Sequence, residues 1–103
     1  MNHKYHIYQL DGNNPNVSKN RKMFMDWDML HKYCGGFDIK DYIKTYDGEI
    51  DSNERDIVIL DILFEEFNLR HPDDFHGHSM SVSDVVILDG TIYFCDGLGW
   101  KKI

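Results

Sequence analysis

Apolar residues that favour β-strands are concentrated at both ends of the chain, with a loose apolar–polar alternation at the start. Near the start, Lys4–Leu10 alternates loosely and is rich in Tyr and Ile, which favours a strand. Near the end, Met80–Leu88 and Thr91–Cys95 are rich in β-formers and flank Asp89-Gly90. Two such stretches on either side of Asp-Gly are the strongest short signal for a hairpin. We therefore expect a C-terminal β-hairpin.

Turn-forming residues separate the remaining stretches. Every residue of Asp11–Asn16 is a turn former, so this segment predicts a loop. The pattern of Phe37–Tyr46 favours extended backbone, and Asp47-Gly48 then predicts a turn. A second turn over Asp96–Gly99 precedes Trp100–Ile103, which we expect to complete the sheet.

Apolar residues at helical spacing predict a first, short helix over Asp26–Cys34. Asp26 or Asp28 supplies the oxygen that an N-cap needs. Gly35-Gly36 then ends the helix, because glycine readily adopts the left-handed conformation of a C-terminal cap.

A second helix is predicted after Asp51–Glu54, whose sequence resembles a capping box. Asn68 and then Pro72 end it. Its apolar stripe consists of Ile57, Leu60, Leu63, Phe64 and Phe67.

Strands at both ends with helices between them predict an α+β fold: a mostly antiparallel sheet, two helices and the C-terminal β-hairpin. The 103 residues suffice for one domain and are too few for two, so residues 1–103 are expected to form a single domain. Cys34 and Cys95 lie far apart and outside any CxxC pair, which favours two buried thiols in a reducing compartment. The apolar stretches are too short for a membrane span or a signal peptide, so we expect a cytoplasmic protein without membrane contact.

Negative charge is concentrated in one segment. The chain carries a net charge of -7, and residues 47–74 hold ten acidic side chains against two basic ones. Such a charge disfavours direct binding to nucleic acid, because the phosphates would repel the domain. The segment is either a solvated face or a surface for a basic protein partner. The candidate acidic surface consists of Asp47, Glu49, Asp51, Glu54, Asp61, Glu65, Glu66, Asp73 and Asp74.

The densest set of chemically active side chains lies in residues 71–84. Its members are His76, His78, Ser79, Ser81, Ser83 and Asp84. Two histidines near Asp73 or Asp74 are a weak signal for a metal site, because no second His or Cys pair stands at a defined spacing. The serines near histidine and aspartate lack the sequence context of a nucleophile elbow. The preferred interpretation is a loop held by Asx and Ser turns, with Phe75 and Met80 in the core. We expect no catalytic residue, cofactor or metal.

The C-terminal part of the chain resembles the YodL-like domain family. The resemblance rests on Phe67-Asn68, Pro72–Phe75, Gly77–Val86 and Tyr93–Trp100, and it is looser at Tyr42, Tyr46–Glu49 and His6–Leu10. Residues 42–103 fit well and the first 41 poorly, and Trp100 stands where the family pattern has Phe. The resemblance implies that Phe67, Phe75, Tyr93 and Trp100 belong to the core, and that Ser79, Ser81, Ser83 and Asp84 mark the loop and hairpin.

The resemblance also implies a protein of bacterial mobile elements or phages, without enzymatic activity or cofactor. Together with the acidic segment, it leads us to expect an inhibitor of host defence. Such a protein would bind a host nucleic-acid enzyme, such as a CRISPR or restriction nuclease. The alternatives are a modulator of the actin-like cytoskeleton and cell shape, and an accessory scaffold domain.

Overall fold

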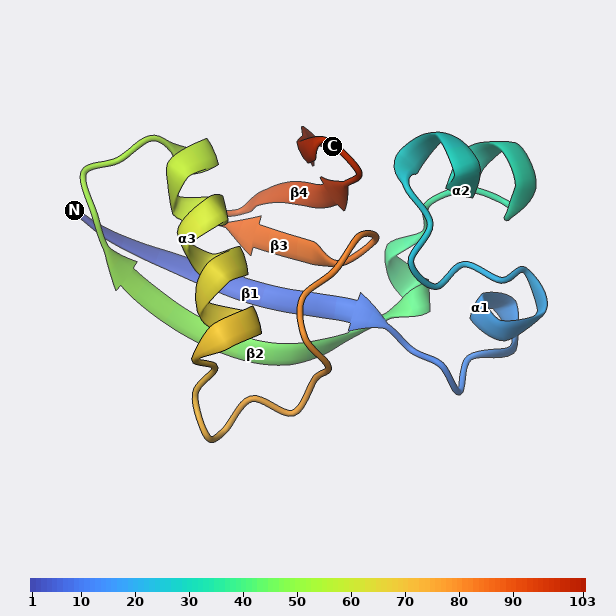
Figure 1. Ribbon diagram of the computed structural model, residues 1–103, viewed down its shortest axis with the longest axis horizontal. Helices are drawn as coiled ribbons and strands as arrows, with labels where there is room; N and C mark the ends of the chain where they lie inside the picture. Colours follow the sequence, from blue (N-terminus) through green and yellow to red (C-terminus); the bar gives the residue numbers. More distant parts are fainter.

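A five-stranded antiparallel sheet organises the computed structural model, which describes residues 1–103. The strands lie in the order β2-β1-β3-β4-β5. Their bounds are β1 (Asn2–Leu10), β2 (Tyr42–Asp51), β3 (Val85–Leu88), β4 (Thr91–Asp96) and β5 (Gly99–Lys102). The helices are α1 (Pro15–Lys19), α2 (Trp27–Tyr33), the 3-10 helix η1 (Ile39–Asp41) and α3 (Asp56–Leu69). α3 lies across one face of the sheet, and α1 and α2 gather beyond the end of β1 (Figure 1). The expected α+β class is confirmed.

Two hydrophobic cores hold these elements together. The larger core lies between α3 and the sheet and consists of Tyr5, Ile7, Ile59, Leu60, Leu63, Phe67, Phe75, Met80, Val86 and Leu88. The smaller core connects α1, α2 and the opposite face of the sheet and consists of Leu10, Val17, Leu30, Cys34, Tyr42, Val85 and Phe94. Neighbouring residues of one strand point to opposite faces, so Val85 and Val86 serve different cores. The expected burial of Phe75, Met80 and both cysteines is confirmed.

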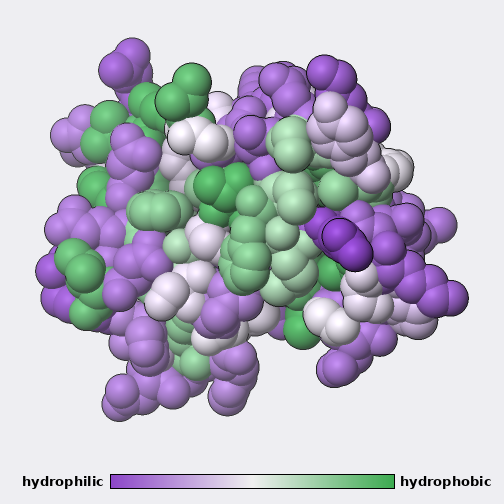
Figure 2. Space-filling view, turned by 45° about the vertical axis from the view of Figure 1, so that its right-hand side comes forward, coloured by the Kyte–Doolittle hydropathy of each residue, from purple (hydrophilic) through white to green (hydrophobic).

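The smaller core is only partly enclosed. Met23, Met25, Trp27 and Phe37 pack against it but remain half-buried, and Phe24 is 59% exposed. A space-filling view turned toward this end of the molecule shows hydrophobic residues in the middle of the face and hydrophilic residues around them (Figure 2).

The sequence correctly predicted the turn between β3 and β4 and both ends of α2 to within a residue or so, because short local signals determine them. Asp89 and Gly90 have φ angles of 49° and 85°, which suit the hairpin turn between β3 and β4. Asp26 caps α2 by accepting a hydrogen bond from the backbone N–H of Met29 at 2.8 Å. Gly35 and Gly36 end that helix with φ angles of 87° and 91°.

The predicted turn at Asp47-Gly48 is wrong, because both residues lie inside β2. Gly48 pairs with Tyr5 of β1. A Cβ atom at Gly48 would lie 2.4 Å from the Tyr5 ring, so the missing side chain leaves room for that ring. This glycine serves a close approach between strands rather than a turn.

The predicted capping box at Asp51–Glu54 is also wrong. Asp51 belongs to β2 and pairs with the N-terminal amine of Met1 at 3.0 Å. α3 begins at Asp56, and its N-cap residue, Arg55, makes no side-chain capping bond. Ser52 instead accepts a hydrogen bond from the backbone N–H of Glu54 in a local turn.

Three further boundaries differ from the prediction. The strand expected from Met80 starts only at Val85, because Ser83 has a φ angle of 77°, which a strand does not allow. The loop expected over Asp11–Asn16 ends earlier, because Asn14 caps α1 and Pro15 occupies its first position. The segment expected to be extended over Phe37–Tyr46 contains η1 before it enters β2. None of the helices has the length and apolar character required to cross a bilayer.

Candidate functional site

Asp84 occupies the centre of a buried polar cluster that joins β1 to the loop before β3. Its Oδ2 accepts hydrogen bonds from Gln9 Nε2 at 3.0 Å and from the backbone N–H of Ser81 at 2.9 Å. Gln9 Nε2 also donates to the backbone oxygen of His78 at 2.8 Å. Burial raises the pKa of Asp84 to about 6, although its hydrogen bonds with Gln9 and Ser81 and the nearby His78 lower it. The cluster therefore anchors the loop through a carboxyl group that is almost fully enclosed.

Ser83 connects three parts of the fold. Its backbone oxygen accepts a 2.6 Å hydrogen bond from the Tyr42 hydroxyl, and its Oγ accepts a 2.9 Å bond from the backbone N–H of Phe24. Burial raises the pKa of Tyr42, so the phenol remains protonated and keeps donating this bond at ordinary pH. Ser83 thus holds the segment before α2 and the start of β2 against the hairpin.

The remaining members of this loop do not converge on a catalytic arrangement. Ser79 and His76 are exposed, and the buried Ser81 Oγ has no hydrogen-bond partner. His78 Nε2 lies 3.9 Å from Asp84 Oδ1, and its Nδ1 lies 2.7 Å from the backbone oxygen of Ser79. No serine hydroxyl bonds to a histidine, which a serine nucleophile activated by histidine requires. No group of three or more His, Cys, Asp and Glu side chains is arranged to hold a metal ion.

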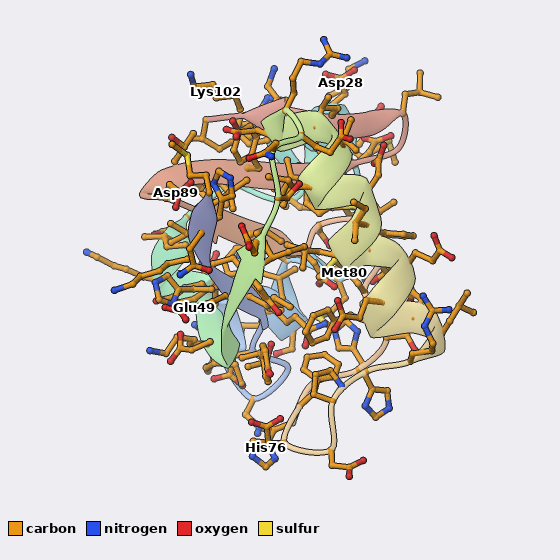
Figure 3. All side chains as sticks on the ribbon, turned by 90° about the vertical axis from the view of Figure 1, so that its left-hand side faces the viewer. Asp28, Glu49, His76, Met80, Asp89 and Lys102 are labelled. Atoms are coloured by element: carbon orange, nitrogen blue, oxygen red, sulfur yellow. The ribbon has the colours of Figure 1, made fainter.

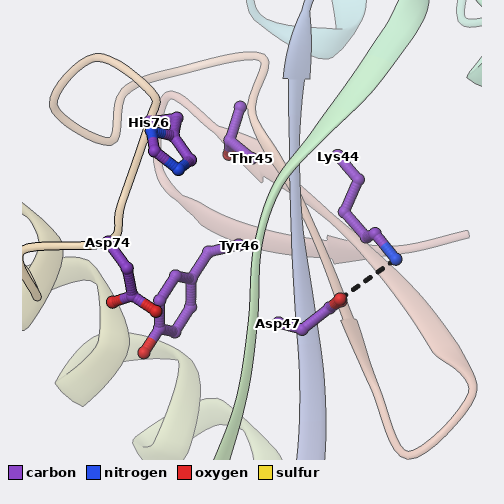
Figure 4. A pocket seen from close by; sticks show the side chains of 6 residues that line it. All are labelled: Lys44, Thr45, Tyr46, Asp47, Asp74 and His76. Atoms are coloured by element: carbon purple, nitrogen blue, oxygen red, sulfur yellow. Dashed lines mark ion pairs between the residues drawn. The ribbon is translucent and has the colours of Figure 1, made fainter.

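A polar hollow of about 280 Å³ lies beside the edge strand β2. It is lined by Lys44, Thr45, Tyr46, Asp47, Asp74 and His76 (Figure 4). The ammonium of Lys44 is held by Asp47 at 3.0 Å, which raises the pKa of Lys44. Burial and the charges of Asp74 and Glu66 raise the pKa of Tyr46. The hollow therefore contains both positive and negative side chains, and the ammonium of Lys44 is already paired with Asp47.

The acidic segment is divided between the two sides of the sheet. Tyr46 and Ile50 of β2 pack toward α3, so the alternating residues Asp47, Glu49 and Asp51 point away from it. The side-chain view along the sheet shows Glu49 on the side opposite α3 (Figure 3). The carboxylates of α3 and of the loop that follows it form the second group. The candidate acidic surface is therefore two surfaces rather than one.

Most of these carboxylates have no cationic partner. Asp47 pairs with His6 and Lys44, which lowers the pKa of Asp47, and Asp51 pairs with the N-terminal amine. Asp56 and Asp61 accept hydrogen bonds from neutral groups, the hydroxyl of Tyr93 and the indole of Trp100. No cation lies within ion-pair distance of Glu49, Glu54, Asp56, Asp61, Glu65, Glu66, Asp73 or Asp74.

A second hollow of about 240 Å³, which we call the α3–β5 notch, lies between α3 and the turn before β5. Its walls are Asp61 and Phe64 of α3, Val82, Cys95, Asp96 and Trp100, together with Gly97 and Gly99 of the turn. The sequence prediction included Asp61 but missed Phe64, Val82 and Asp96 as site residues. Asp96 was visible only as a turn former, and the stripe containing Phe64 indicated a core position.

Comparison with known proteins places the chain in a family. The model of the YodL-like domain family matches residues 4–103. The chain belongs to the YodL-like domain family. The match begins at residue 4, so it extends far beyond residues 42–103, where the resemblance is clearest from sequence. No curated protein matched this YodL-like domain, and no solved structure matched it.

The structure shows where the family's sequence features lie in this YodL-like domain. Phe67 and Phe75 are buried in the larger core, and Tyr93 and Trp100 pack against it. The stretches Gly77–Val86 and Tyr93–Trp100 come together at the α3–β5 notch, where they contribute Val82, Cys95, Asp96 and Trp100. The most distinctive part of the sequence therefore forms both the polar anchor at Asp84 and one wall of the notch.

Proposed function

We propose that this YodL-like domain is a non-enzymatic binding protein of a phage or another mobile element, acting in the host cytoplasm as a counter-defence inhibitor. It blocks a host nucleic-acid enzyme of the CRISPR or restriction nuclease type by occupying the basic surface that normally holds nucleic acid. The observation that supports this proposal is the set of eight carboxylates between residues 49 and 74 without an ion-pair partner.

Unpaired surface carboxylates favour a basic partner for a simple electrostatic reason. No cation of the chain is paired with these carboxylates, and several on one side add to a negative potential that attracts a positively charged channel. Complementary charge accelerates the encounter and weakens as salt screens it, with a Debye length that falls from about 10 Å at 0.1 M to about 3 Å at 1 M salt.

The side that carries α3 is the better candidate for the contact. Its helix exposes Ile57, Ile62 and Leu69, which are 41%, 41% and 69% exposed, between the acidic side chains. Exposed aliphatic groups add apolar contact area to the charge attraction. The acidic residues of β2 instead share their face with Lys44, which belongs to the Asp47 ion pair, and with His6.

Two charge-reversal variants with the same change in net charge test the proposal. Glu65→Lys/Asp73→Lys alters the α3 side, and Glu49→Lys/Asp51→Lys alters the β2 side. The tagged parent protein is first used for capture from bacterial lysate at low and high salt, and a captured nuclease is then assayed for inhibition. We expect the α3-side variant to inhibit much less than the parent and the β2-side variant to inhibit nearly as well.

Equal inhibition by the parent and the α3-side variant would contradict the proposal. Capture of an actin-like filament protein, together with rounded cells on overexpression, would instead support the alternative role in cell shape. Capture of the same proteins in the same amounts at both salt concentrations would exclude an electrostatic mode of binding.

A further inference from the structure

Two aromatic residues and two aspartates are among the residues that line the α3–β5 notch. The rings of Phe64 and Trp100 are nearly perpendicular, with an interplanar angle of 83° and a distance of 6.4 Å between their centroids. Asp61 stands on the α3 side of the notch, whereas Asp96 lies at the end of β4 and its carboxylate bonds to the backbone N–H of Trp27 at the start of α2. A concave surface of this composition favours a positively charged group, because ring faces and carboxylates both attract cations.

Each of the two carboxylates has one oxygen engaged in the fold and one without a bonding partner. Asp61 Oδ1 accepts from Trp100 Nε1 at 3.2 Å, which orients the indole. Asp96 Oδ1 accepts from the backbone N–H of Trp27 at 3.0 Å and from that of Gly97 at 2.9 Å. In both side chains, only Oδ1 takes part in the hydrogen bonds that hold the fold. Neither Oδ2 atom accepts a hydrogen bond from the chain.

The chain itself supplies no cation to this notch. Neither Asp61 nor Asp96 takes part in an ion pair. Lys101, which follows Trp100, has its ammonium over the ring of Trp27 at 5.3 Å from the centroid. Burial raises the pKa of Cys95, which also lines the notch, and the negative charges of Asp84, Asp96 and Asp61 raise it further.

We propose that the α3–β5 notch receives an arginine side chain of a protein partner. A planar guanidinium stacks on an aromatic ring and presents several N–H donors to carboxylates, which a compact ammonium does less well. The volume of about 240 Å³ is below the range typical of pockets for whole small molecules, roughly 300–1,000 Å³, and suits one side chain. The inference rests on the proposed function in one respect, namely that the partner presents a basic protein surface.

Titration with a small peptide tests the notch without any knowledge of the partner. The probe is acetyl-Gly-Arg-Gly-amide, and its neutral counterpart carries citrulline in place of arginine. The ¹⁵N-labelled protein reports binding through the indole N–H of Trp100 and the backbone amides of Gly97 and Gly99. We expect saturable shifts of these three signals with the arginine peptide at millimolar concentration and none with the citrulline peptide.

The matched variants are Asp61→Asn/Asp96→Asn and Glu49→Gln. Asparagine keeps the Oδ1 acceptors of both positions and removes the charge. Glu49 has no ion-pair partner and points away from α3, so its variant controls for the loss of charge alone. The double variant should weaken binding of the arginine peptide at least about tenfold, the effect of 1.4 kcal/mol, and Glu49→Gln should leave it unchanged.

Four outcomes would overturn the inference: no shift in the parent, equal shifts with citrulline, equal affinity for a lysine peptide, or equal weakening by Glu49→Gln. If the double variant fails to fold, the titration of the parent with the arginine, lysine and citrulline peptides still decides the question. The peptide titration requires no nuclease, and the Glu65→Lys/Asp73→Lys test leaves every wall of the notch intact. Failure of one proposal is therefore distinguishable from failure of the other.

Discussion

Gln9 and Asp84, which are 75 residues apart in the chain, meet inside the protein through a 3.0 Å hydrogen bond from Gln9 Nε2 to Asp84 Oδ2. This bond attaches the end of β1 to the loop that leads into the hairpin. Both side chains are buried, at 1% and 2% exposure, so the interaction is shielded from water. A carboxyl group in such a place makes folding sensitive to pH.

The first prediction concerns that sensitivity. Burial raises the pKa of Asp84 from its ordinary value of 3.8 to about 6 in the folded protein. Between these values the folded state binds more protons than the unfolded chain, so stability falls as the pH rises through this window. We expect the free energy of unfolding to decrease by about 2–3 kcal/mol from pH 4 to pH 6 on account of this group.

Asp84→Asn is the variant that checks this prediction, because asparagine keeps an acceptor for Gln9 and Ser81 but does not ionise. Urea unfolding at half-unit intervals between pH 4 and pH 6.5, on the order of six conditions, measures the profile of both proteins. The variant should lose the decrease that the parent shows. Parallel profiles would mean that Asp84 has an ordinary pKa in the folded state.

A second prediction concerns Gly77, which lies against the same cluster. A Cβ atom at this position would lie 1.8 Å from Gln9 Oε1 and 2.9 Å from the Phe75 ring. Gly77→Ala should therefore destabilise the protein by about 1–3 kcal/mol, the usual cost of overpacking. Gly12→Ala is the matched control, since nothing lies within 4 Å of its Cβ position. Thermal unfolding of the two variants should give clearly different midpoints, and similar midpoints would show that the loop can shift at little cost.

A third prediction concerns the buried ion pair between Lys22 and Asp41. Their Nζ and Oδ2 atoms are 2.7 Å apart, and each side chain is 3% exposed. Lys22 also donates to the backbone oxygen of Gly36 at 2.9 Å, and thereby connects the segment before α2 with the residues after it. Lys22→Met leaves a buried carboxylate without its counter-charge and should cost about 3–5 kcal/mol.

The control for that variant is Lys44→Met, which breaks the exposed pair with Asp47 and should lower the stability far less than Lys22→Met does, because water screens an exposed pair. The double variant Lys22→Met/Asp41→Asn should lose less than Lys22→Met alone, because the uncompensated charge is gone. A double variant that is less stable than Lys22→Met would contradict this account. Urea unfolding of all four proteins, with the parent included, provides the comparison.

The fold was predictable where a short sequence determines local geometry. Asp89-Gly90 and Asp26 act through their own backbone and the residues next to them, so the hairpin and the cap of α2 follow from sequence. Asp47-Gly48 carries the same turn signal but lies in a strand, because Tyr5, far away in sequence, fills the space above the glycine. Sequence alone does not contain that contact.

The acidic residues of the candidate surface were predictable from sequence, but their layout and the other residues of the notch were not. The acidic residues of β2 and of α3 are adjacent in sequence, yet the register of β2 sends Asp47, Glu49 and Asp51 to the face opposite α3. The α3–β5 notch depends on the packing of α3 over β5, which brings Asp61 and Phe64 to Trp100. Such a contact between separate elements follows from tertiary packing.

The last prediction concerns Cys95, whose thiol forms part of the wall of the notch. Burial, together with the negative charges of Asp84, Asp96 and Asp61, raises its pKa to about 12. The thiolate is the reactive form, so at pH 8 the native thiol should react about a thousandfold or more slowly than an ordinary cysteine. A Cys34→Ser variant leaves Cys95 as the only thiol, and Ellman's reagent measures its rate in the native and the urea-unfolded protein. Rapid reaction in the native protein would place a reactive nucleophile in the notch and contradict its assignment as a surface that only binds.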